Sequence, residues 1–266
     1  SSFGDKVFVV CNTIFLVAFV IINLYPVLNT VVLSFNNGID AVRGGIHLLP
    51  RVFTLQNYKT VLDQQNIVTG AYISVARTVV GTILALAANA LLAYVVSRKR
   101  FLFRSQLSLF WVITMYVSGG MIPTLILYRN LGLTGTFWVY VIPGMISVFN
   151  MLVLRTYMMG LPEGLEESAQ IDGANDFTIF VRIISPLCKP VYATVALFVA
   201  VGQWNSWFDV MLYNRMNTKY TTLQYELMKL LSSVMQQGGS ASSAGQGAAA
   251  AVTPVTVRAA ATVVTM

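Results

Sequence analysis

Long apolar runs recur along the chain and are separated by polar stretches. A helix needs about 20 apolar residues to cross the hydrocarbon core of a bilayer, and the sequence supplies runs of that length several times. We therefore expect an all-α integral membrane protein with a single transmembrane domain over residues 1–266. The predicted spans are residues 7–33, 71–96, 107–127, 137–157 and 191–212, with a partial run at 252–266.

The last apolar run is too short to cross a membrane as a helix. At about 1.5 Å per residue it reaches about 22 Å, against about 30 Å of hydrocarbon. We therefore expect a six-helix topology in which the sixth span is truncated. The two long polar segments, residues 34–70 and 213–251, are expected to lie outside the membrane as loops, the first with a short helix near 55–62.

The composition supports a membrane class. Hydrophobic residues make up 56% of the 266 residues and charged residues only 10%, with a mean hydropathy of +0.69; a soluble domain carries about 25% charged residues. The formal net charge is +7, but the cations are scattered or end the apolar runs, which favours membrane helices with basic flanks over a nucleic-acid surface. Cys11 and Cys188 form no CxxC pair, so neither a disulfide nor a metal site is predicted.

The densest basic cluster, Arg98, Lys99, Arg100 and Arg104, follows the second predicted span. Short loops rich in Lys and Arg are retained in the cytoplasm, so we expect this cluster to be cytoplasmic. The loop after the fourth span, residues 161–190, then lies on the same side of the membrane.

Residues 161–190 form a long polar interruption with the pattern of helix, turn, helix. Pro162 and the carboxylates after it suit the first turns of a helix. Asp172-Gly173 offers a stop, because glycine adopts the left-handed conformation without a Cβ clash, and Asn175 or Asp176 can cap a second helix. Small residues near the turn would let a partner's surface approach closely. The predicted docking residues are Glu163, Glu166, Glu167, Ser168, Ala169, Asp172, Gly173 and Ala174.

The same segment resembles the EAA loop of the membrane permease subunits of ATP-binding-cassette (ABC) importers. Glu167-Ser168-Ala169 is followed at the family's spacing by Gly173, Ile183 and Pro186. Ser168 and Ser185 stand where the family has Ala and Leu, which leaves the spacing intact. The surrounding letters EESAQIDGAN are most similar to the carbohydrate-uptake permeases of the maltose type.

This resemblance implies the transmembrane domain of a type I ABC importer, in which the 161–190 loop is the coupling helix that sits in a groove of a cytoplasmic ATPase. The implied partners are a second homologous permease subunit, two ATPase subunits, an extracytoplasmic solute-binding protein, membrane lipid and a carbohydrate. ATP and magnesium would be used by the ATPases, with no cofactor bound by this chain and no nucleic acid involved. The implied location is a bacterial or archaeal cell membrane, crossed several times, with the coupling loop in the cytoplasm.

The residues that catalysis would need are missing from the sequence. It has one histidine, His47, and lacks GxSxG, HExxH and GxxxxGK[ST] motifs, so we expect neither an enzyme nor a metal site. An ion-coupled secondary transporter would need ionisable residues within its spans. Arg77 and Asp209, near the ends of their spans, are almost the only ones, which argues against that class.

Polar side chains in the fifth predicted span are candidates for a substrate path. Gln203 and Trp207 fall on one face of a continuous helix, and an amide beside an indole suits the hydroxyls and the ring face of a sugar. Packing between helices and anchoring at the membrane interface are the alternatives; for Asn89 and Asn150 we favour interhelical hydrogen bonds. The candidate path residues are Gln203, Trp204, Asn205, Trp207 and Asn150.

The resulting prediction is the membrane-spanning subunit of an ATP-driven importer, which translocates a sugar or oligosaccharide delivered by an extracytoplasmic binding protein. An importer for a non-sugar solute, such as a peptide or a polyamine, is the alternative, because the form of the loop favours a sugar by resemblance alone.

Overall fold

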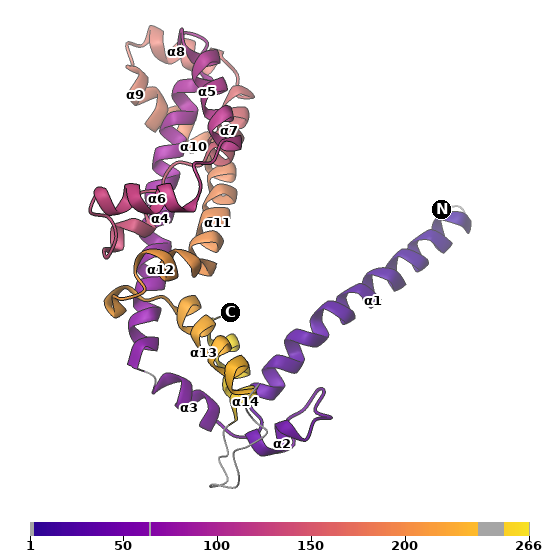
Figure 1. The fold of residues 1–266 in the computed structure, drawn as a ribbon. Helices are drawn as coiled ribbons and strands as arrows, with labels where there is room; N and C mark the ends of the chain where they lie inside the picture. The colour runs from indigo at the N-terminus through magenta and orange to yellow at the C-terminus, as the bar shows by residue number, and fades with distance from the viewer. Residues whose placement is uncertain (1–2, 64, 239–252, 266) are drawn as a thin grey trace. The chain divides into compact units, whose positions relative to one another are not determined.

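The computed structural model describes residues 3–63, 65–238 and 253–265 (Figure 1). The regular elements within these ranges are helices. One isolated antiparallel β-bridge pairs Asn36 with Phe53. The chain divides into two compact units, Ser1–Val68 with Glu226–Met266, and Thr69–Tyr225. The boundaries between the two units fall near the start of α4 and within α13.

The first unit is built on α1 (Phe3–Ser34), which covers the predicted span at 7–33. Helix α14 (Pro254–Thr265) packs against α1, α2 (Gly38–Val42) and α3 (Gln56–Leu62). Helix α3 confirms the short helix expected near 55–62, whereas α2 was not predicted. The buried Asn57 side chain holds α3 against the end of α1. Its Nδ2 donates to the carbonyls of Ser34 and Asn36, each at 2.9 Å.

The second unit surrounds α4 (Gln65–Ser97), an unbroken helix that contains and extends the predicted span at 71–96. It contains no proline, so each interior turn can keep its backbone hydrogen bonds. Helices α4, α7 and α11 and the 161–190 segment share one apolar core. Fully buried members of this core are Ala93, Met151, Leu154, Ile179, Ile184, Cys188 and Val195.

The expectation of one continuous helix over residues 107–127 is wrong. The chain forms α5 (Arg104–Tyr116) and α6 (Met121–Asn130), which meet at an angle of 113°. Gly120 lies at the break with a φ of +87°, a conformation that glycine adopts without a Cβ clash. The break therefore redirects the chain within the predicted span.

The expected helix over residues 137–157 is also interrupted. A 3₁₀ turn, η1 (Phe137–Tyr140), is followed by irregular backbone and then by α7 (Val148–Met159). Pro143 and Gly144 lie in the irregular part; proline has no N–H for a helical hydrogen bond, and glycine weakens a helix interior. Ser147 then starts α7, because its hydroxyl accepts a hydrogen bond from the backbone N–H of Asn150 at 3.4 Å.

The predicted span at 191–212 corresponds to two helices, α11 (Lys189–Asn205) and α12 (Phe208–Tyr213). Since α11 ends at Asn205, the prediction that Gln203 and Trp207 share a face of one continuous helix is wrong. At its other end, α11 is bent by 81° from the helical segment Asp176–Leu187.

The segment 213–251 is not wholly a loop. It contains a 3₁₀ turn, η3 (Thr218–Tyr220), and the amphipathic helix α13 (Leu223–Gly238). Residues 239–251 of the predicted loop lie outside the described residues, as do residues 252 and 266 of the partial sixth run.

Two described helices, Phe3–Ser34 and Asn66–Ser97, are long and apolar enough to cross a membrane. The number rises to four if each bent pair, α5 with α6 and Asp176–Leu187 with α11, is one broken span. Helix α7 and residues 255–265 of α14 are apolar but shorter. The helical membrane architecture is therefore confirmed, although the predicted spans are more often broken than continuous.

Candidate coupling loop and polar pocket

The 161–190 segment folds as the predicted helix, turn, helix. Helix α8 (Gly164–Ile171) ends at a turn in which Gly173 has a φ of +80°. The N–H of Gly173 donates to the carbonyl of Gln170 at 3.0 Å, and that of Ala174 to the carbonyl of Ala169 at 2.9 Å, which satisfies the last carbonyls of α8. Asn175 then caps α9 (Asp176–Ile179), accepting from the N–H of Thr178 at 2.8 Å.

The second arm of the loop continues through a π-helical turn, η2 (Phe180–Ile184), into α10 (Ser185–Leu187). Phe180 is buried, and its ring lies 5.0 Å from the ring of Tyr94 on α4, centroid to centroid. Ile184 is also fully buried in the shared core. The second arm is thus held on α4 by apolar contacts.

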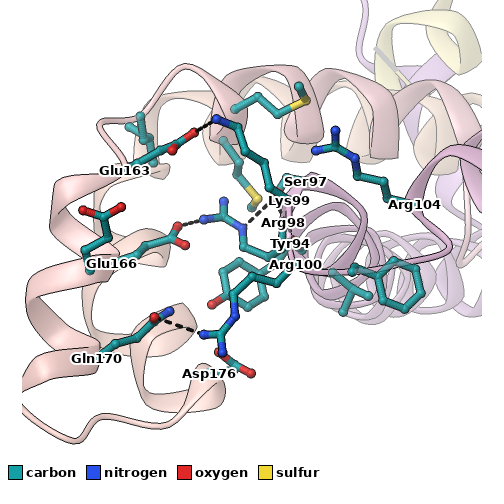
Figure 2. Close-up of a pocket in the computed structure, with 16 residues that line it drawn as sticks. Tyr94, Ser97, Arg98, Lys99, Arg100, Arg104, Glu163, Glu166, Gln170 and Asp176 are labelled. Atoms are coloured by element: carbon teal, nitrogen blue, oxygen red, sulfur yellow. Dashed lines mark hydrogen bonds and ion pairs between the residues drawn. The ribbon is translucent and has the colours of Figure 1, made fainter.

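The first arm of the loop, helix α8, is held beside the end of α4 by polar contacts in addition to its buried Ala169. Arg98 pairs with Glu166 and Lys99 with Glu163, while Arg100 donates from Nη1 to the side-chain oxygen of Gln170 at 3.0 Å. Figure 2 shows these three pairs side by side, with α8 on one side and the residues that follow α4 on the other. They line a pocket of about 510 Å³, into which Arg104 and Asp176 also project.

The predicted docking residues are therefore divided between two faces. Glu166 turns toward α4, and Ala169 is buried in the core, so neither faces outward. Ala174 is partly buried against the same core. The exposed members of the predicted set are Glu163, Glu167, Ser168, Asp172 and Gly173.

Two exposed apolar residues flank the turn and were not predicted as docking residues. Ile171, the last residue of α8, is 86% exposed, and Phe177, in the first turn of α9, is 68% exposed. Two large apolar side chains beside an exposed turn are typical of a protein-binding surface.

A second, polar pocket of about 430 Å³ lies among α4, η1, α11 and α12. Its wall combines three tyrosines with amide, hydroxyl and charged groups. The polar and aromatic lining residues are Arg77, Tyr128, Tyr140, Gln203, Ser206, Asp209 and Tyr213.

Arg77 organises this pocket, although its own side chain is only 2% exposed. Its Nη2 lies 2.5 Å from Oδ2 of Asp209. Its Nε and Nη2 donate to Oε1 of Gln203 at 3.0 and 2.9 Å, and its Nη1 donates to the carbonyl of Ser206 at 3.4 Å. The guanidinium also lies 4.6 Å from the ring centroid of Tyr140. One side chain of α4 therefore holds both helices that meet at the α11–α12 break.

The candidate path residues are not gathered in this pocket. Among its described lining residues only Gln203 belongs to the predicted set. Asn205 is exposed and hydrogen-bonds to the carbonyl of Val201 and to Gln224. Trp207 packs against the apolar cluster around Tyr140, and Trp204 is partly buried.

The two remaining amides lie near the start of α7. Asn150 is buried there and does not line the pocket. Asn89 of α4 is fully buried: its Nδ2 donates to the carbonyls of Ala85 and Met145 at 2.7 and 2.9 Å, and its Oδ1 accepts from the N–H of Ser147 at 3.0 Å. The favoured interpretation of Asn89, a hydrogen bond between membrane segments, is confirmed.

Within the described residues, no group of three or more His, Cys, Asp or Glu side chains could hold a metal ion. The arrangement offers a polar pocket inside the helical unit and an exposed, rigid loop at one end of α4. These features define a helical membrane protein whose loop is suited to a partner's surface.

Comparisons with known proteins also indicate a membrane component of a transport system. Residues 77–208 match the family model described as "Binding-protein-dependent transport system inner membrane component". The polygalacturonan/rhamnogalacturonan transport system permease protein YtcP of Bacillus subtilis is 36% identical over 206 residues, which cover 77% of this chain and 72% of that protein. Protein LplC of the same organism is 37% identical over 217 residues, covering 82% and 74%.

A solved structure of a bacterial ABC transporter involved in the import of the acidic polysaccharide alginate also matches. The TM-score is 0.88 at 28% identity, over 100% of this chain and 93% of that one. This chain belongs to the family of inner-membrane components of binding-protein-dependent transport systems. The resemblance to ABC-importer permeases that was stated from the sequence is therefore confirmed.

Proposed function

We propose that this chain is the membrane-spanning subunit of an ATP-driven importer that translocates a sugar or oligosaccharide delivered by an extracytoplasmic binding protein. The observation that carries the proposal is the exposed 161–190 loop, which lies against the end of α4 in a chain of this family. Its two helices are capped where they meet at the turn. Relatives named for polygalacturonan, arabinooligosaccharide and alginate transport support a carbohydrate substrate over a peptide or a polyamine.

The proposed partners are a second homologous permease, two ATPase subunits and a solute-binding protein. The loop lies in the cytoplasm and docks on an ATPase through its exposed residues, with Ile171 and Phe177 as the apolar part of the contact. ATP and magnesium are used by the ATPases, and this chain binds no cofactor. A docking contact shifts the transport cycle only if it differs between the two states of the ATPase, and a stiff loop transmits that difference.

The proposed sugar contact is the polar pocket around Gln203. Tyrosine rings can stack on the apolar face of a sugar while amide and hydroxyl groups bond its hydroxyls. Trp204, Asn205, Trp207 and Asn150 stay proposed members of a longer path, outside the pocket itself. Gly81 of α4 permits the close approach of the Gln203 side chain, since a Cβ there would lie 3.0 Å from its Nε2.

The test is the ATPase rate of the complete transporter in lipid, with its binding protein, across a panel of oligosaccharides, amino acids, peptides and polyamines. Stimulation by one class of sugar is the expected result. Stimulation by a non-sugar alone would contradict the carbohydrate substrate while leaving the importer assignment in place.

A further inference from the structure

The end of α4 carries three successive cations that reach one face of α8. Consecutive residues of a helix point about 100° apart, but α4 ends at Ser97, so Arg98, Lys99 and Arg100 lie in a turn. Their partners at positions 163, 166 and 170 are spaced three and four residues apart, which aligns them along a helix. The basic cluster is thus more than a marker of membrane orientation, because it binds the loop of its own chain (Figure 2).

Arg98 is the most enclosed member of this cluster. The side chains of Arg98 and Glu166 are 20% and 16% exposed, whereas those of Lys99 and Glu163 are 71% and 63% exposed. Burial lowers the pKa of Arg98 from its usual value, and the neighbouring Tyr94, Cys188 and Glu163 oppose that change. Exposed ion pairs are screened by water and contribute little, so of the two ion pairs Arg98–Glu166 contributes more to holding α8 in place.

Arg98 also connects the two arms of the loop. Its Nε donates to the hydroxyl of Ser97 at 3.0 Å, and its guanidinium lies 4.7 Å from the ring centroid of Tyr94. Tyr94 in turn contacts Phe180 in the π-helical turn, and the centroids of their rings are 5.0 Å apart. A continuous series of contacts therefore runs from Glu166 on the first arm, through Arg98 and Tyr94, to Phe180 on the second.

We propose that Arg98 is a positioning residue that joins the coupling loop to α4, so that the loop and α4 move as one body. The inference rests on the proposed function, because it requires the loop to be displaced by an ATPase. Helix α4 continues without a break from Ser97, the residue before Arg98, to Arg77, a distance of about 30 Å at 1.5 Å per residue. Movement of the loop is thereby delivered to the polar pocket at Arg77.

Helix α11 offers a less direct connection. It is the next helix along the chain after the loop, and it shares the buried core with the loop, but the backbone reaches it through the 81° bend beyond Leu187. Load applied to the loop therefore passes through side-chain contacts into α4 as well as along the backbone into α11. The Arg98 contact makes the first of these routes stiff.

The experiment measures substrate uptake per ATP hydrolysed by the complete transporter in proteoliposomes. Arg98→Ala is expected to lower this ratio at least fivefold while ATP hydrolysis continues. The charge-exchanged double variant Arg98→Glu with Glu166→Arg should restore it to within twofold of wild type. Lys99→Ala, which removes the exposed pair beside it, should change the ratio less than twofold.

A ratio in Arg98→Ala within twofold of wild type would overturn the inference, and so would a loss that the exchanged pair does not restore. If Arg98→Ala fails to assemble with the ATPases, Glu166→Gln removes the same pair without removing the Tyr94 contact and is judged by the same ratio. Coupling between distant sites needs such a direct measurement. Failure of the proposed function is distinguishable from failure of this inference, because the wild-type complex itself would then show no sugar-dependent uptake. That result would also remove the basis of the inference.

Discussion

Arg77 and Asp209 form an ion pair within the helical unit, with 2.5 Å between Nη2 and Oδ2, although they come from α4 and α12. The arginine is buried, while the aspartate keeps 21% of its side chain exposed at the edge of the polar pocket. Because Arg77 also binds Gln203 and the carbonyl of Ser206, the pair holds together the two helices on either side of a break. In this protein a charged pair within a predicted span has a structural role.

Replacing Asp209 with Ala should destabilise the protein by about 3 kcal/mol, because the buried guanidinium of Arg77 would lose its counter-ion. The measurement is the thermal unfolding of the purified complex. Arg51→Ala is the matched control, since it removes a pair whose arginine is 51% exposed and whose N–O distance is 3.7 Å; it should cost less than about 1 kcal/mol. Equal losses in the two variants would contradict the structural role of the Arg77–Asp209 pair.

Replacing Gly173 with Asp should uncouple uptake from ATP hydrolysis while the protein remains inserted and folded. No atom lies near a Cβ at this position, so the cost arises from the φ of +80°, which is unfavourable for a side chain by about 1–2 kcal/mol. Gly164→Asp is the control, because that glycine also faces open space but its φ lies outside the left-handed region. The readout is uptake per ATP, and an unchanged ratio in Gly173→Asp would count against the stiff loop.

Replacing Phe177 with Ser should weaken the binding of the ATPase subunits without a loss of folding stability, because the side chain is exposed. The same result is expected for Ile171→Ser. Co-purification of the ATPases with this chain measures the effect, expected as at least a fivefold decrease. Met216→Ser removes an apolar side chain that is 95% exposed and lies outside residues 161–190, and it should leave the yield unchanged. An undiminished yield from both loop variants would rule out the apolar docking contact.

Replacing Asn89 with Leu should cost about 2 kcal/mol, because the carbonyl of Met145 and the N–H of Ser147 would lose their partner in a buried site. The unfolding midpoint of the purified complex reports the change. Asn23→Ala provides the comparison, since the exposed amide of Asn23 bonds only the carbonyl four residues earlier in its own helix. A midpoint for Asn89→Leu that matches this control would show that the amide does not stabilise the α4–α7 region.

The elements that could be predicted from sequence are those determined by neighbouring residues. Helices α1 and α4 follow from their long, predominantly apolar runs. The turn at Gly173 follows from local backbone chemistry and was predicted correctly; the cap was predicted at Asn175 or Asp176 and lies at Asn175. The breaks at Gly120 and Pro143 were visible as residues but could not be predicted as breaks, because membrane helices tolerate glycine and proline when neighbouring segments satisfy the freed backbone groups.

The contacts that shape the candidate sites join residues far apart in the sequence. Arg77 meets Asp209 across 132 positions, and no local pattern marks either as the partner of the other. The acidic residues of α8 could be assigned to a helix start, but not to inward and outward faces, until the end of α4 was placed against them. Gln203 was predicted as a path residue because an amide beside an indole suits a sugar; its hydrogen-bond partners could not be identified in that way.

The Arg98–Glu166 pair also limits how the loop can be exchanged between related permeases. A graft of residues 161–190 would carry Glu163, Glu166 and Gln170 but leave behind the cations that bind them. A chimera would then keep the recognition surface of one parent without the polar contacts that position its first arm. The smallest transferable module in this protein is therefore discontinuous, made of the loop together with the three residues that follow α4.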